Sequence, residues 1–224
     1  MSKINRKYLC KRINTIDHDR LHTFELSRVL HAVKKVDLRT LCPPVYDQGN
    51  LGSCTANAIA GAYHFDEIKE KEKNAILPSR LGIYYGERLI EGSVSEDSGA
   101  SLQDGINVVS NTGVYPESMW PYNPAKFADK PPQKCLDVAP NHKCNKFKQL
   151  AQNLNQLKQC LIAGYPFVLG ITVYDSFESD TVAQTGIVPM PTSSDTNMGG
   201  HAIMCVGYDD DHKWFICRNS WGAD

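Results

Sequence analysis

Three residues of this sequence have side chains that could act together in nucleophilic catalysis: Cys54, His201 and Asn219. A thiol attacks a carbonyl carbon as its thiolate, and the first turn of a helix lowers a thiol pKa because free backbone N–H groups favour negative charge there. Cys54 begins such a run, in CTANAIAGAYHF, with Ser53 as the expected helix cap. A nucleophile of this kind also needs a base that a third group holds in place.

His201 and Asn219 fit the roles of base and orienting group. His201 opens a strand-like run after two glycines, in GGHAIMCVGY, whereas the other histidines lie in charged or loop-like segments. Asn219, in RNSWG, offers an amide oxygen that accepts a hydrogen bond from imidazole without adding a charge. Taken singly, each of the three residues has a structural alternative: a small buried thiol, a half-buried histidine at a strand end, and a turn asparagine.

The elements that would position these residues change in kind along the chain. Apolar residues at helical spacing predict helices over residues 53–73, from Pro78 onward, and over residues 101–110. After a short helix near residues 153–163, the runs PFVLGITVY, HAIMCVGY and KWFICRNS have strand length and many β-branched or aromatic residues. Helices first and strands second predict an α+β fold. The proline-rich segment 120–135 is the expected boundary between two lobes.

The motifs QGNLGSC, GGHAIMCVGY and RNSWG together resemble those of the papain-like cysteine peptidases, and VDLR resembles the start of a mature enzyme. The resemblance runs from about Val36 to the end of the chain, and positions 54 and 201 are 147 residues apart, against roughly 130–150 in that family. It implies a domain over residues 36–224, in the papain-like two-lobe fold. The helical lobe would span about 53–130, and the antiparallel β-barrel lobe about 136–224 with 36–50 crossing to it. The active-site cleft would lie between them.

The resemblance also implies a role for each matching residue. Cys54 would be the nucleophile, His201 the base and acid, and Asn219 the residue that orients the imidazole. Gln48 would complete an oxyanion hole together with the Cys54 backbone N–H. Trp221 would shield the histidine–asparagine hydrogen bond from water, the alternative being an ordinary core tryptophan.

Further positions match the substrate-binding residues of the family. Gly99 would pair with the backbone of an extended substrate, the alternative being a turn glycine. Small residues would line the pocket for the side chain two residues before the cut: Ala100, Ser101, Gly170, Gly199 and Ala202. Gly200 precedes the histidine and belongs to the same surface. We therefore expect a roomy pocket that accepts large apolar or aromatic side chains.

The sequence departs from the family pattern in several places. Leu51 and Glu96 stand where many secreted members have the two cysteines of a disulfide. Thr55 replaces the usual tryptophan, and Gly200 stands where an acidic or amide residue is common, which would change how the thiolate–imidazolium pair titrates. Family members continue beyond the position of Asp224 through a closing strand. Two alternatives stand: the sequence is a piece of a longer chain, or another segment covers the open sheet edge.

Residues 1–35 precede the region of resemblance. They contain a basic opening and then HDRLHTFELSRVLHAV, which predicts one amphipathic helix. In this family a leading segment commonly lies across the cleft in the direction opposite to substrate. We therefore expect a short inhibitory pro-segment that is cut near Lys34–Lys35, as in a zymogen. The alternative is a disordered tail or an arm that binds a partner.

Composition excludes several other classes of protein. The formal charge of −1 argues against a nucleic-acid partner, and no apolar run has the ~18 residues of a membrane span. The N-terminus lacks a secretory signal, so we expect a cytoplasmic protein, or one otherwise not secreted by the classical route but packaged or released by another. Its eight cysteines would be mostly free thiols. Cys135 and Cys144, with His142 between them, lack zinc-site spacing, so we expect no metal and no cofactor.

The function expected from these features is that of a cathepsin-like thiol protease, a hydrolase that cleaves peptides or proteins through an acyl-enzyme. Two alternatives remain at this point. One is a catalytically silent relative that keeps the papain fold for binding or as a scaffold, and the other, smaller one is an acyl transferase with the same thiol.

Overall fold

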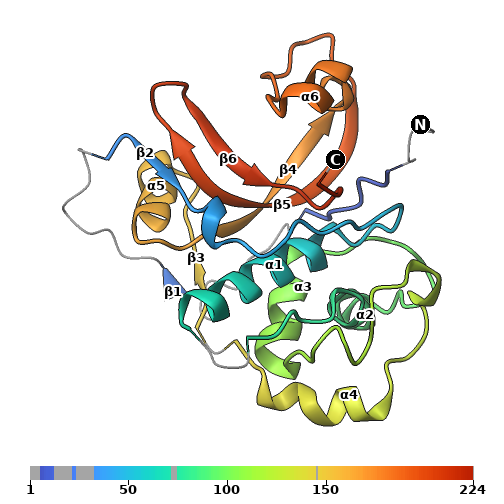
Figure 1. The fold of residues 1–224 in the computed structure, drawn as a ribbon. Coiled ribbons are helices and arrows are strands. Elements are labelled where there is room, and N and C mark those ends of the chain that lie inside the picture. Colours follow the sequence, from blue (N-terminus) through green and yellow to red (C-terminus); the bar gives the residue numbers. More distant parts are fainter. Residues whose placement is uncertain (1–5, 13–21, 24–32, 72–74, 145, 224) are drawn as a thin grey trace.

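The computed structural model describes residues 6–12, 22–23, 33–71, 75–144 and 146–223. A sheet lies on one side of the molecule and the helices α2, α3 and α4 on the other, with α1 between them (Figure 1). The helices are α1 (Cys54–Lys69), α2 (Arg80–Ile90), α3 (Leu102–Asn107), α4 (Gln133–Val138), α5 (Leu154–Ile162) and α6 (Asp180–Thr185). The strands are β1 (His22–Thr23), β2 (Lys35–Asp37), β3 (Lys148–Gln149), β4 (Phe167–Tyr174), β5 (Asn197–Asp209) and β6 (Trp214–Arg218).

The helix α1 is buried along its first turns and joins the two halves of the molecule. Ile59 and Ala60 pack against α2 and its neighbours, whereas Phe65 packs against the sheet. The predicted cap is wrong in detail: Ser53 makes no capping bond with its side chain, because its hydroxyl lies 2.6 Å from that of Tyr122. The side chain of Ser53 therefore accepts no hydrogen bond from the free backbone N–H groups in the first turn of α1.

The other predicted helices are present with shifted ends. α2 begins at Arg80 and not at Pro78, because the Ser79 hydroxyl caps it by accepting from the Gly82 backbone N–H at 3.1 Å. α3 is shorter than expected and continues as a π-helical turn over Val108–Thr112. α1 ends at Lys69, short of the expected residue 73.

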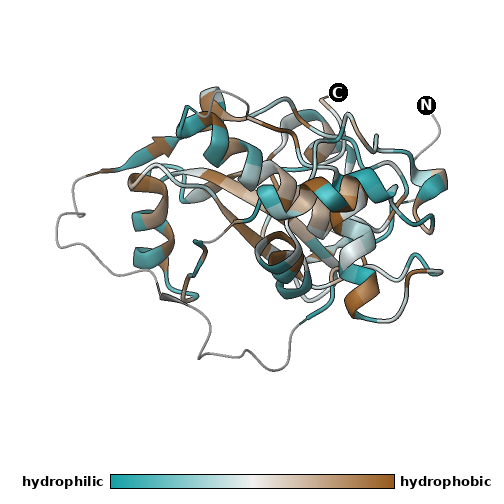
Figure 2. Ribbon diagram, turned by 90° about the horizontal axis from the view of Figure 1, so that it is seen from below, coloured by the Kyte–Doolittle hydropathy of each residue, from teal (hydrophilic) through white to brown (hydrophobic). Residues whose placement is uncertain are grey.

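The three predicted strand runs form β4, β5 and β6, and β5 is central to the sheet. It pairs antiparallel with β4 along its first part, with β2 at its end, and with β6 on the other edge. Among the described residues these four strands make an open sheet, so the closed β-barrel expected from the resemblance is not formed. Phe167, Met204 and Tyr208 fill the core between the sheet, α1 and α5. The long strands seen behind the helices in Figure 2 are largely hydrophobic.

The proline-rich segment 120–135 belongs to the helical half. Trp120 and Phe127 pack on its core, and α4 packs through Cys135 against Tyr115. The backbone of Cys144 still bonds to Val109 in the helical half at 3.1 Å. The transition to the sheet half therefore follows Cys144, later than the boundary near residue 136 that the sequence pattern predicts.

The leading residues are described in three short pieces. Residues 6–12 run extended alongside β5, between the sheet and the helical half (Figure 1). His22–Thr23 form the short strand β1, which pairs in parallel with β3. An amphipathic helix was predicted over residues 18–33, and apart from residues 22, 23 and 33 this range lies outside the described residues. Within the described part of the chain, every helix is too short or too polar to cross a bilayer.

Candidate active site

Cys54 is the first residue of α1 and is fully buried. Its side chain packs with Ala58 one turn along the helix and with Ala202 of β5, so the thiol faces the junction of helix and sheet. The orphan N–H groups of the α1 start lie next to it, which is the arrangement that favours a thiolate. The prediction that Cys54 begins a helix is therefore confirmed.

His201 and Asn219 meet beside this thiol. The two residues come from β5 and from the turn after β6, and His201 Nε2 lies 2.8 Å from Asn219 Oδ1. Because the amide oxygen can only accept, Nε2 carries the proton of this bond. The other ring nitrogen, Nδ1, is buried and has no partner at strict hydrogen-bond geometry among the described residues. His201 is nevertheless close enough to Cys54 to favour its thiolate, so Nδ1 is the nitrogen that can exchange a proton with the thiol.

Trp221 stacks on the His201 ring, with the ring centroids 5.0 Å apart and an angle of 29° between the planes. Its other neighbours are Phe177, edge to face at 5.4 Å, and the guanidinium of Arg6, 4.2 Å above the indole. This partly exposed indole lies against the imidazole that bonds Asn219 and is no ordinary core residue.

Gln48 is buried near the start of α1, and its side chain is held at both ends. The amide nitrogen donates to the Leu51 carbonyl at 2.9 Å, and the amide oxygen accepts from the Ser220 hydroxyl at 2.6 Å. An amide nitrogen carries two hydrogens, so one remains for a further hydrogen bond. Ser220 was not among the predicted site residues. The signal that could have identified Ser220 is its position directly after Asn219, inside the motif RNSWG.

Most of the positions predicted to bind substrate lie close to the chain's own residues 8–11. The Cys10 N–H donates to the Gly200 carbonyl at 3.0 Å, and the Lys11 N–H donates to the Ala100 carbonyl at 2.9 Å. Both pairings are parallel bridges. Gly99, with φ of +67°, lies so near the backbone of Leu9 that any Cβ there would collide with it. The pocket prediction and the path of the N-terminal segment therefore coincide.

The side chain of Cys10 fills the place next to Cys54. It packs with Cys54, Ala58 and Ala202, and Gly170 leaves room for its sulfur, which lies 3.5 Å from where a Cβ would stand. The Ser101 hydroxyl caps α3 by accepting from the Asp104 backbone N–H, and its place in the pocket wall stays a prediction. No local pattern in the sequence marks Cys10 as part of the site.

The side chains of Cys10 and Cys54 pack against each other, and this changes both acidities. The neighbouring Cys10 and burial raise the pKa of Cys54 strongly, against the opposing effect of His201. The neighbouring Cys54 in turn lowers the pKa of Cys10. With residues 8–11 in place, Cys54 is therefore held as a thiol.

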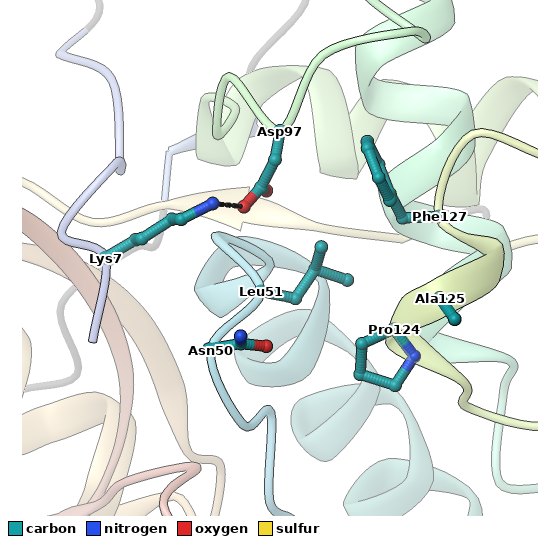
Figure 3. Close-up of a pocket in the computed structure, with 7 residues that line it drawn as sticks. All are labelled: Lys7, Asn50, Leu51, Asp97, Pro124, Ala125 and Phe127. Carbon is teal, nitrogen blue, oxygen red and sulfur yellow. Dashed lines mark hydrogen bonds and ion pairs between the residues drawn. The ribbon is translucent and has the colours of Figure 1, made fainter. Parts of the chain in front are cut away.

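Two ion pairs fix the N-terminal segment to the helical half. Lys7 Nζ lies 2.5 Å from a carboxylate oxygen of Asp97, above a cavity of about 350 Å³ that Leu51 and Phe127 help to line (Figure 3). Lys11 pairs with Glu91. Both lysines are partly exposed, so each pair contributes little binding energy by itself.

A buried carboxyl lies behind the site. Glu87 of α2 is fully buried and accepts a hydrogen bond from the Thr55 hydroxyl at 2.8 Å. Burial raises the pKa of Glu87 well above its usual value, so the group is neutral and adds no charge near Cys54. The small Thr55, which replaces a tryptophan, is what allows this contact.

Among the residues that the structure describes, no cluster of three or more His, Cys, Asp or Glu side chains has the form of a metal site. All eight cysteines are free thiols. Cys135 is buried against Met119 and Tyr115, and Cys144 lies at the end of the helical half, bonded to the Lys146 carbonyl.

Comparisons with known proteins agree with this geometry. A family model described as papain family cysteine protease matches residues 32–224. An uncharacterised peptidase C1-like protein of Acanthamoeba polyphaga mimivirus is 45% identical over 185 residues, covering 79% of this chain and 60% of the relative. Cathepsin B-like CP3 of Giardia intestinalis is 29% identical, covering 81% of this chain and 61% of the relative. The chain thus spans about three fifths of these relatives' length.

Solved structures confirm the predicted fold. Xylellain, a cysteine protease from Xylella fastidiosa, has a TM-score of 0.84 and 42% identity, covering 97% of this chain and 86% of that one. Procathepsin B S9 from Trypanosoma congolense has a TM-score of 0.76 at 14% identity, covering 98% of this chain and 79% of that one, a likeness of fold alone. The two-lobe α+β architecture is therefore that of a papain-like protein.

Proposed function

Because the chain belongs to the papain family of cysteine proteases, we propose that it hydrolyses peptide bonds through Cys54 and is latent while residues 6–12 fill the cleft. The observation that carries this proposal is the His201–Asn219 bond of 2.8 Å beside the buried thiol at the α1 start. It supplies the three parts that a thiol nucleophile needs.

In the proposed reaction, the Cys54 thiol first passes its proton to His201 Nδ1. The resulting thiolate attacks the carbonyl carbon of a peptide bond. The developing oxyanion is bound by the Cys54 backbone N–H and by the free hydrogen of the Gln48 amide. His201 then protonates the leaving amine, the C–N bond breaks, and a thioester remains on Cys54. Water, deprotonated by His201, attacks the thioester and releases the acid.

Asn219 and Trp221 act on the imidazole and not on the substrate. Asn219 fixes the ring so that Nδ1 faces the thiol, and the stacked indole limits the access of water to the bond between them. The substrate would take the place of residues 8–11, with its backbone on Gly99 and Gly200. We propose that the pocket beside Ala100, Gly170 and Ala202 accepts a large apolar side chain.

Latency follows from where residues 8–11 lie. Their backbone occupies the hydrogen-bonding groups that a substrate needs, and Cys10 covers Cys54. Activation would require that this segment leave. Cleavage at the bond between Lys34 and Lys35 is disfavoured in the folded chain, because the carbonyls of Val33 and Lys34 are bonded to Tyr208 and Asp210. We propose that the cut falls before Val33.

The test is hydrolysis of fluorogenic peptides by a chain that begins at Val33, under reducing conditions. We expect hydrolysis that the Cys54→Ser variant of the same chain loses by roughly a thousandfold or more. Cys160→Ser is the matched control, because this thiol is buried in the sheet half far from the cleft. A folded chain without activity, or activity that survives Cys54→Ser, would overturn the proposal in favour of a silent papain-fold protein.

A further inference from the structure

We propose that Cys10 and Cys54 form a reversible disulfide that locks the N-terminal segment over the nucleophile, so that the full chain is released by reduction. The latency that this bond would control rests on the proposed function, but the bond itself does not. It makes Cys10 a modification site of the chain and adds control by thiol reductants to control by proteolysis.

The geometry of the two thiols carries the inference. The side chain of Cys10 packs against that of Cys54 in one small cluster with Ala58 and Ala202. Cys10 is held there by backbone bonds on both sides of its side chain, to Gly200 at 3.0 Å and, through Lys11, to Ala100 at 2.9 Å. Such anchoring raises the effective concentration of one thiol at the other, which favours an internal disulfide over separate adducts with small thiols.

The side chain of Cys10 lies against two glycines of the sheet. Its sulfur faces Gly170, 3.5 Å from where a Cβ would stand, which is an ordinary van der Waals contact. Backbone contact with Gly200 is closer still, since a Cβ on that glycine would collide with the Cys10 carbonyl. A serine would also fit this space, so hydrogen bonding alone does not demand a thiol.

The two cysteines differ in access, which sets the order of the steps. Cys10 is partly exposed and Cys54 is fully buried, so a small oxidant reaches Cys10 first. Its acidity points the same way, because the neighbouring Cys54 lowers the Cys10 pKa. The thiolate is the species that attacks a disulfide.

The oxidant is a low-molecular-weight disulfide such as oxidised glutathione. The Cys10 thiolate attacks one of its sulfurs, which forms a mixed disulfide on Cys10 and releases one small thiol. Cys54 then passes its proton to His201 Nδ1 and attacks the Cys10 sulfur, which expels the second small thiol. That thiol takes the proton from His201. Two protein thiols are oxidised, one small disulfide is reduced to two thiols, and the reverse exchange opens the lock.

A second thiol pair in the molecule provides an internal comparison. Cys205 of β5 and Cys217 of β6 are directly opposite each other on the two paired strands. This pair lies away from the cleft, so its oxidation would not cover Cys54. Cys217→Ser removes it while leaving Cys10 and Cys54 unchanged.

The experiment uses the full chain, incubated with oxidised glutathione, blocked with iodoacetamide and digested without reduction for mass spectrometry. We expect a peptide pair joined through Cys10 and Cys54. We also expect labelling of Cys54 by an epoxysuccinyl peptide to fall by roughly tenfold or more after oxidation and to recover with dithiothreitol. The Cys217→Ser variant should behave in the same way. The Cys10→Ser variant should form no cross-link, and dithiothreitol should therefore release no Cys54 thiol from a cross-link in this variant.

Recovery of Cys10 and Cys54 as free thiols, or as separate glutathione adducts, would overturn the proposal. The result is independent of catalysis: if the cross-link forms and the chain beginning at Val33 hydrolyses nothing, the proposed function fails while the disulfide is supported. If that chain is active and the full chain forms no cross-link, the proposed function stands and the disulfide fails.

Discussion

Two leading pieces of the chain, residues 6–12 and residues 33–37, both lie against β5, but they are held very differently. Residues 33–37 continue the sheet: β2 pairs antiparallel with the end of β5, Leu38 bonds to Val206 at 2.9 Å, and the buried Tyr208 donates to the Val33 carbonyl at 2.6 Å. Residues 6–12 are held by isolated bridges, by ion pairs of partly exposed lysines and by the packing of Cys10 beside Cys54. Residues 6–12 can leave without removing a strand from the sheet, whereas residues 33–37 cannot.

The largest effect should come from removing one piece and keeping the other. A chain that begins at Val33 should hydrolyse peptides about 100-fold faster than the full chain, because the cleft no longer depends on rare opening of the segment. A chain that begins at residue 38 lacks β2 and should unfold at a lower temperature. Initial rates and thermal unfolding check both. Equal rates for the full chain and the chain from Val33 would contradict the inhibitory role.

The same removal should shift the pH dependence of Cys54. In the full chain, Cys10 and burial raise the Cys54 pKa, so its thiolate forms only at higher pH. Without residues 1–32 the pKa falls, and alkylation by iodoacetamide should reach its plateau at lower pH, by at least about one unit. Cys160, whose pKa burial raises to about 11, is the reference and should react alike in both chains. Superimposed Cys54 profiles would count against the thiol pair.

Single substitutions should separate the two pieces further. Lys7→Met removes the ion pair with Asp97 and should raise full-chain hydrolysis a few-fold without changing the free energy of unfolding, as expected for a partly exposed pair. Tyr208→Phe should lower the free energy of unfolding by about 1 kcal/mol without changing latency. Kinetics and urea denaturation measure the two quantities. A lower free energy of unfolding for Lys7→Met together with faster full-chain hydrolysis for Tyr208→Phe would contradict the difference between the two pieces.

The smallest effect concerns substrate choice in the opened cleft. A panel of fluorogenic dipeptides should show a several-fold preference of the chain from Val33 for a large apolar or aromatic residue two positions before the cut, because Ala100, Gly170 and Ala202 leave an apolar space. A preference for glycine or for a charged residue there would refute this assignment.

The sequence allowed prediction of the site where motifs carry chemistry in short stretches. Cys54, His201 and Asn219 were identified from three such stretches, and the structure brings all three together. The strands β4, β5 and β6 followed from apolar runs of strand length, and the pattern is clearest in β5, which is buried continuously from His201 to Asp209.

What escaped prediction depends on contacts between distant residues. Ser53 fails to cap α1 because Tyr122, far along the chain, takes its hydroxyl. Cys10 reaches Cys54 through backbone pairing with Gly200 and Ala100, and backbone groups carry no sequence signature. The open sheet also escaped prediction, because closure depends on which strand edges pair with each other and not on the sequence of any one strand.

The central claim is that Cys54 is a nucleophile that residues 6–12 keep covered. It is tested most directly by treating the full chain and the chain from Val33, both reduced, with an epoxysuccinyl-peptide inhibitor and locating the adduct by mass spectrometry. The account predicts rapid labelling at Cys54 alone in the chain from Val33 and slow labelling in the full chain. No adduct at Cys54 in either chain, or equal rates in both, would contradict it.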